Sequence, residues 1–200
     1  MPVADILVGP VNVWYSAVGT ALPSINTVAV GASWGAGWTN PGLTLTPLAL
    51  NYESDQSKME VEQYPSPINI SRTAESMLLE TTLAEFTAAN LKTALAGTGA
   101  ITTVAAGASV HASDTYSFGG DITLPQLQWG FETWALDASN NKLPKRWFIY
   151  KAVATLGGKV EFSKKNTLGI PLKLMALCDT SKAAGAQLCQ VQIVTGWKTS

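Results

Sequence analysis

The 200-residue sequence has little charge. Aspartate, glutamate, lysine and arginine make up 14% of it, against about 25% in typical soluble proteins. Between Asp5 and Glu53 there is no charged residue at all. Because charged side chains keep exposed surface soluble and discourage sticking, a chain with so few of them is often covered by a membrane or by other protein chains.

Long apolar runs are also absent, and this argues against a membrane. The sequence has no run of about 18 apolar residues, the length of a membrane-spanning helix. The N-terminal stretch MPVADILVGPVNVW has no basic leader before an apolar core and includes Asp5, so it is not typical of a signal peptide. We therefore expect no membrane insertion, and a surface covered by other protein chains.

Residues that carry out catalysis or bind metals are scarce. His111 is the only histidine. No metal-ligand spacing surrounds it, so we expect a surface histidine without a special role. A Ser-His-Asp or Cys-His arrangement would need this residue. GASWGAG lacks the Lys and Ser or Thr of a phosphate-binding loop. The sequence therefore predicts no enzyme, no cofactor and no metal.

Cys178 and Cys189 are the only cysteines, and each lies in a separate apolar strand candidate. We expect two buried free thiols in a reducing compartment. The alternative is a cross-strand disulfide, which would need an oxidising location.

Charge is unevenly placed along the chain. Residues 1–100 hold eight acidic and three basic groups, and residues 101–200 hold six acidic and ten basic ones. Copies with an acidic half and a basic half can attract each other head to tail. A chance asymmetry is the alternative.

Apolar and polar residues alternate with a period of two along most of the sequence. This pattern predicts a mainly β protein, a β-sandwich or barrel. We expect a single domain over residues 1–200, with an N-terminal strand and arm over 6–40 and a long β-hairpin over 50–72. No linker or internal repeat divides it.

One flanking helix is predicted at about residues 82–96. Thr82 and Glu85 have the spacing of a capping box, apolar residues recur every three or four positions, and Gly97 is a natural stop. Such a short helix must pack on the sheet. Residues 98–121 are small and polar, and we expect a flexible insertion there.

Two charged segments have more than one interpretation. The carboxylate pairs Glu53/Asp55 and Glu60/Glu62 each share a strand face at a spacing of two. They fit a solvated face or the lining of a channel better than catalysis, since glycoside hydrolysis needs carboxyls on opposite walls of a cleft. The run KLPKRWFIYK at 142–151 mixes basic and aromatic residues, as single-strand nucleic-acid platforms do. A strand buried on both faces explains it equally well.

The order of several segments resembles the major tail tube proteins of long-tailed bacteriophages and related tail-like particles. The segments are VGPVNVWYSAVGTALP, WTNPGLTLTPLAL, TLAEFTAANLKTAL and VEFSKKNTLGIPLKLMALCD. The resemblance spans residues 6–195, and the 98–121 stretch departs from it by its length. It implies a β-sandwich with a flanking helix that assembles into stacked hexameric rings. The hollow tube is the conduit through which DNA leaves the capsid for the host, without catalysis.

The resemblance also implies partners and a location. The chain would contact itself, the tape-measure protein, the tail terminator and distal tail proteins, while DNA passes transiently. It would be made in the host cytoplasm and reside in the virion. The 50–72 segment would be a hairpin or inter-ring arm, in which residues 57–71 and the flanking strands supply inner-barrel or inter-ring contacts. Its implied inter-subunit contacts are Met59, Val61, Tyr64, Ile68 and Ile70. Of these, Met59, Val61, Ile68 and Ile70 would form one apolar edge, which lies on the sandwich or on a neighbouring copy. Its implied acidic lumen lining is Glu53, Asp55, Glu60 and Glu62.

A second hypothesis is a carbohydrate-binding or adhesive β-sandwich. Its stacking platforms for sugars would come from the tryptophans, which are Trp14, Trp34, Trp38, Trp129, Trp134, Trp147 and Trp197. The long uncharged stretch between Asp5 and Glu53 is more typical of a buried segment than of an exposed binding surface.

Overall fold

The computed structural model describes residues 7–137, 139–162, 164 and 167–196. Its elements follow the chain in this order: β1 (Leu7–Ala17), β2 (Ala49–Met59), β3 (Asn69–Leu83), α1 (Ala88–Ala94), β4 (Ile101–Val104), β5 (Ser113–Tyr116), β6 (Gln126–Leu136), β7 (Lys142–Leu156), β8 (Ile170–Ala176) and β9 (Cys189–Ile193). The prediction of a mainly β fold with a single helix is confirmed, and the sheet curls into a half-barrel.

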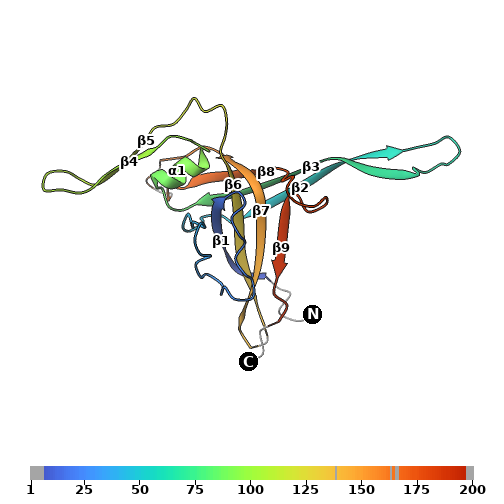
Figure 1. Cartoon of the computed structure of the whole chain (residues 1–200), viewed down its shortest axis with the longest axis horizontal. Coiled ribbons are helices and arrows are strands. Elements are labelled where there is room, and N and C mark those ends of the chain that lie inside the picture. Colours follow the sequence, from blue (N-terminus) through green and yellow to red (C-terminus); the bar gives the residue numbers. More distant parts are fainter. Residues whose placement is uncertain (1–6, 138, 163, 165–166, 197–200) are drawn as a thin grey trace.

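Strand β7 organises the main sheet, whose order is β1-β6-β7-β8-β3-β2. One edge of β7 pairs with β6. Along the other edge, residues 145–149 pair with β9 and residues 152–156 pair with β8. The sheet therefore divides at β7 into an upright part, β1-β6-β7-β9, and a crossing part, β8-β3-β2 (Figure 1). The main core fills the inside of this fold, and it includes Trp129, Phe131, Ile149 and Leu174.

The outer face of the upright strands carries a second apolar cluster. Trp14, Trp34, Trp38 and Phe148 pack together there, with Trp14 and Trp34 stacked at 5.3 Å between ring centroids. Trp34 and Trp38 come from the long uncharged connection between β1 and β2. This segment is thus anchored by its aromatic residues, while much of the remainder stays exposed.

The helix is shorter than predicted, and the Thr82–Glu85 capping box is wrong. Strand β3 continues to Leu83, because Thr82 and Leu83 pair with Pro171 and Ile170 of β8. Thr87 is the actual N-cap, and its hydroxyl accepts a hydrogen bond from the Asn90 amide. Pairing with β8 therefore keeps Thr82 in a strand, although the local sequence favours a helix cap there.

The 98–121 stretch contains a second hairpin, β4–β5, which forms its own two-stranded sheet. Tyr116 of β5 packs so closely on Gly97 that a Cβ at that position would clash with the tyrosine hydroxyl. This close approach fixes the base of the hairpin beside α1. The stretch is therefore not the structureless loop that its small residues suggest, and its predicted flexibility stays a prediction.

Both cysteines in the described residues are free thiols, as predicted, but neither is buried as predicted. Cys178 is exposed beyond the end of β8, whereas Cys189 is half-buried at the start of β9. Burial raises the pKa of the Cys189 thiol.

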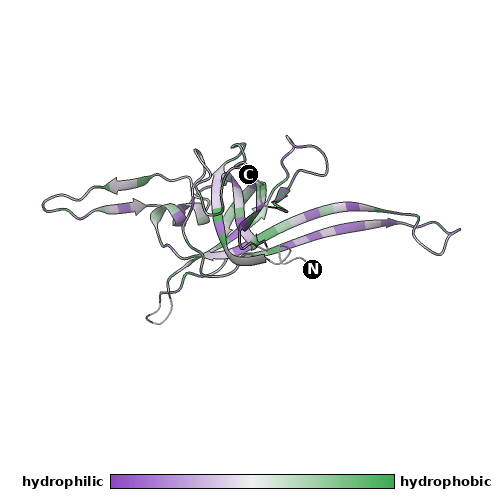
Figure 2. Cartoon of the chain, turned by 90° about the horizontal axis from the view of Figure 1, so that it is seen from below, coloured by the Kyte–Doolittle hydropathy of each residue, from purple (hydrophilic) through white to green (hydrophobic). Residues whose placement is uncertain are grey.

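The β2–β3 hairpin projects far from the body, and β4–β5 extends in the opposite direction (Figure 1). From residue 55 to residue 74, every residue of the hairpin is exposed except Val61, which is half-buried. The turned view shows the same slender ribbon, with polar and apolar residues interspersed along it (Figure 2). The predicted 50–72 arm is therefore present as a hairpin, and it extends further, to Leu83.

Candidate assembly surface

The projecting hairpin has two faces with different chemistry, set by its register. Partners directly opposite each other share a face. Leu50–Leu79 and Tyr52–Met77 lie on the face that continues into the core. Asn51–Leu78, Glu53–Ser76 and Asp55–Ala74 lie on the other face. We call these the core-side face and the acidic face.

The acidic face carries negative charge without a matching cation. Glu53 and Asp55 are two positions apart on β2, and Asn51 donates its side-chain amide to Glu53 Oε1 at 2.8 Å. Their cross-strand partners on β3 are Ser76 and Ala74. Along the described strands from Asn51 to Met59, this face holds no lysine or arginine. A phosphate backbone moving along it would be repelled rather than bound.

The core-side face instead carries cations, one of which pairs with a carboxylate. The Tyr52 hydroxyl and Arg72 Nη1 both donate to Glu75 Oε2, each at 2.9 Å. The Arg72 guanidinium also lies 5.8 Å from the centre of the Tyr52 ring. The hydrogen bond to the Glu75 carboxylate raises the pKa of Tyr52. This network stiffens the point where the hairpin leaves the body.

The prediction of one apolar edge is wrong. Met59 pairs with Asn69, whereas Ile70 pairs with Lys58, so Met59 and Ile70 point to opposite faces. The strands end at Met59 and resume at Asn69. The residues between them lie in the connecting turn, where strand alternation does not apply; they include Glu60, Val61, Glu62, Tyr64 and Ile68. The pairing across the turn, not the alternation of each strand alone, decides which residues share a face.

The acidic residues consequently form two groups. Glu53 and Asp55 share the acidic face of the strands, while Glu60 and Glu62 sit in the turn at the tip. The tip is also rich in exposed apolar side chains, because Tyr64 is 64% and Ile68 is 53% exposed. We refer to residues 60–68 as the tip.

An isolated two-stranded ribbon of this kind is only marginally stable in water. The outer edge of β2 pairs with no strand in the part of the chain that the structure describes. Proteins rarely leave a strand of this length with an open edge, because it invites pairing with another chain. This open edge could not be predicted, because the alternation of apolar and polar residues does not show the order of strands in a sheet.

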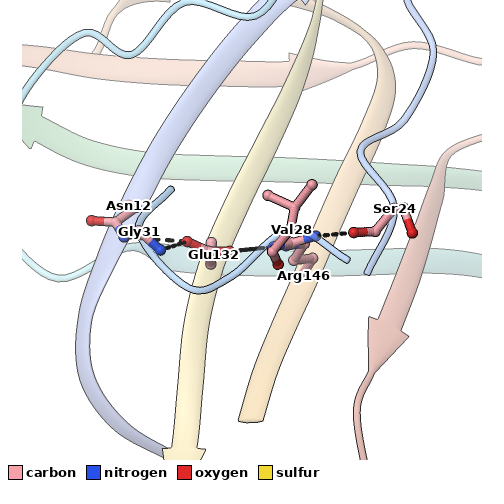
Figure 3. A network of polar contacts seen from close by, with 6 residues as sticks. All are labelled: Asn12, Ser24, Val28, Gly31, Glu132 and Arg146. Carbon is pink, nitrogen blue, oxygen red and sulfur yellow. Dashed lines mark hydrogen bonds and ion pairs between the residues drawn. The ribbon is translucent and has the colours of Figure 1, made fainter. Parts of the chain in front are cut away.

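A buried ion pair on the outer face of the upright strands was also missed (Figure 3). Arg146 and Glu132 are fully buried and lie 2.8 Å apart, Nη2 to Oε1. Arg146 also donates to the carbonyls of Ser24 and Val28, at 3.2 and 2.7 Å. Glu132 Oε2 accepts the Gly31 amide at 2.7 Å. The pair thus ties the uncharged connection between β1 and β2 to the sheet.

This burial removes Arg146 from any nucleic-acid surface. Phe148 is buried as well, and the alternation of KLPKRWFIYK is that of a strand buried on both faces. A signal for the pair did exist: Glu132 and Arg146 are equally far from the turn that joins β6 and β7, as register partners in a hairpin are.

The tryptophans are poorly placed to stack on sugars. Trp14, Trp34, Trp38 and Trp129 are at most 7% exposed. Trp134 is half-buried, and the Lys142 ammonium lies 4.7 Å from the centre of its ring. Trp147 is also half-buried and packs against the main core. Trp197 lies outside the described residues.

The described ranges contain no group of three His, Cys, Asp or Glu side chains arranged to hold a metal ion. His111 is exposed, just beyond the turn between β4 and β5. In the same ranges, no helix has the length and apolar character needed to cross a membrane. No protein-family model matches the sequence, and no curated protein matches it either.

Proposed function

We propose that the protein is a structural subunit that assembles with identical copies into stacked rings, forming the tube of a phage tail or tail-like particle. One observation carries this proposal: the β2–β3 hairpin projects from the body with both faces exposed, and its outer edge pairs with no strand among the described residues. A copy that pairs with this edge removes both the open hydrogen-bonding groups and the exposed apolar side chains from water.

Further exposed apolar residues support a covered surface. Leu43, Phe118, Ile122 and Phe162 are all more than 60% exposed. They lie at several places on the body and add to the exposed residues of the hairpin. A monomer with so little charge and so many exposed apolar groups would be prone to association.

The opposite directions of the two hairpins favour head-to-tail contacts. The acidic β2–β3 hairpin leaves on one side and β4–β5 on the other (Figure 1). A contact between different surfaces of two copies closes into a ring or continues as a filament. By resemblance, the ring is hexameric, and the tape-measure, terminator and distal tail proteins are the partners at its ends. The assembly would reside in the virion.

We place Glu53 and Asp55 at the bore, with Glu60 and Glu62 at the contact between copies. In this arrangement the acidic face repels DNA phosphates, so that DNA slides without sticking. The core-side face, which has Arg72 and Lys58, suits contacts with protein.

Reversing the charge of the acidic face is expected to make assembled tubes retain DNA. The variant Glu53→Lys/Asp55→Lys would present cations to the phosphates and bind them in a salt-dependent way. Duplex DNA retention by purified tubes, and ejection rate where particles are at hand, measure the effect. The matched control is Ser54→Lys/Gln56→Lys, which adds charge to the core-side face. Equal DNA retention by both variants would contradict the bore assignment.

Assembly itself is tested by sedimentation velocity over a concentration series, with negative-stain electron microscopy of the fast species. We expect rings or tubes with a hollow axis at raised concentration. A single monomeric species under all conditions would contradict the proposed function.

A further inference from the structure

A mostly apolar groove lies at the end of the upright strands, far from the hairpin. It has a volume of about 610 Å³, within the range of about 300–1,000 Å³ typical of binding pockets. Residues 25–30 line one side of it, and Lys142, Pro144, Val194 and Gly196 line the other. Val194 donates its amide to the Pro144 carbonyl at 3.1 Å, which joins two of these lining residues.

The buried ion pair holds one wall of this groove in place. Arg146 bonds the carbonyls of Ser24 and Val28, and Glu132 bonds the Gly31 amide. Residues 24–31 are therefore fixed at both ends, without a charged residue of their own. A buried ion pair does not by itself make a folded chain more stable. A wall that is already formed, however, lowers the entropic cost of ordering the groove when a partner binds.

Among the described residues that line the groove, Lys142 is the one cation. Lys142 is exposed, and its ammonium lies over the Trp134 ring at 4.7 Å. Among the described residues, no carboxylate forms an ion pair with it. Asp137, in the adjacent turn, is already engaged, because it accepts hydrogen bonds from Ser139 and Asn141.

The hairpin tip has the complementary composition. Residues 60–68, EVEQYPSPI, combine exposed apolar side chains with Glu60 and Glu62 and contain no lysine or arginine. Neither glutamate has an ion-pair partner in the described chain. The tip therefore offers apolar surface and negative charge, whereas the described lining of the groove offers apolar surface and the positive charge of Lys142.

The two sites cannot meet within one chain. The hairpin is a long ribbon that points away from the body (Figure 1). The groove is lined by Lys142 at the start of β7 and by Val194, which follows the end of β9. We infer that the tip of one copy docks into the groove of a second copy, with Tyr64 against the apolar residues that line the groove and Lys142 facing the tip glutamates. This inference rests on the proposed function and names the surface that receives the hairpin.

Photo-cross-linking tests the contact. With p-benzoylphenylalanine in place of Tyr64, irradiation of the assembled full-length chain is expected to link position 64 to residues 25–30, 142–144 or 194 of another copy. The same probe in place of Phe118, which is 63% exposed elsewhere, should give none of these links. Peptide mass spectrometry locates them.

The outcomes separate the two proposals. Assemblies whose cross-links from position 64 map to other surfaces would overturn the groove as the docking site and leave self-assembly standing. A chain that neither assembles nor cross-links would overturn both.

Charge exchange gives a second reading. Lys142→Glu, and separately Glu60→Lys/Glu62→Lys, should each raise the concentration needed for assembly about tenfold. Combining the three substitutions should recover part of that loss, because the charges are then opposite again. If the combined variant lost as much free energy of assembly as the two separate variants together, the result would contradict a direct contact between these charges.

Discussion

Replacement of residues 55–74 by an Asn-Gly turn is expected to give a folded monomer that no longer assembles. Ser54 and Glu75 are register partners, so a two-residue type I′ turn can join them without altering the remaining strands. The deleted residues are almost all exposed, and their loss leaves the main core intact. The unfolding free energy of the monomer should change by no more than about 1 kcal/mol.

Loss of assembly in this variant should be complete at concentrations at which the full chain forms rings. Sedimentation velocity measures it, and circular dichroism with thermal unfolding verifies the fold. The control is a shortening of the other arm, with residues 105–112 replaced by Asn-Gly between Val104 and Ser113, which are also register partners. A hairpin-free chain that still assembles would show that the contacts lie elsewhere.

Substitution of Arg146 by methionine is expected to be the most destabilising single change. Arg146→Met leaves the fully buried Glu132 carboxylate without its cation, and it frees the carbonyls of Ser24 and Val28. Breaking a buried pair from one side costs about 3–5 kcal/mol. For a domain of this size, that lowers the Tm by roughly 10 °C. Thermal and denaturant unfolding below the assembly concentration measure it.

Arg72→Met is the matched control, because Arg72 makes an ion pair of similar length, 2.9 Å, at an exposed site. Exposed pairs contribute about 0–1 kcal/mol, so its Tm should change little. The double variant Glu132→Gln/Arg146→Met should recover part of the loss, since no buried charge remains. If Arg146→Met were no more destabilising than Arg72→Met, the buried network would not be what fixes residues 24–31.

The sequence predicted much of the fold, because strand alternation is a local property. The period of two indicated the β class, and two alternating stretches separated by Pro-Ser-Pro at 65–67 indicated a hairpin. The helix boundary could not be predicted in the same way. Thr82 fits a capping box locally, but its backbone pairs with Pro171, far along the chain.

The candidate site was predicted only in part, because its geometry depends on register. Alternation within a strand shows that Met59 and Ile70 each face opposite to the residues beside them in the sequence. It does not show that Lys58 lies across from Ile70 and Asn69 across from Met59. The acidic face, the open edge of β2 and the Arg146–Glu132 pair all follow from strand pairing, so composition alone could not reveal them.

A cryo-electron microscopy reconstruction of the assembled chain tests the central claim most directly. We predict a hollow ring in which the β2–β3 hairpin lies between copies, with Glu53 and Asp55 turned to the central channel. A reconstruction without a channel, or one whose hairpins extend freely into solvent, would contradict the account.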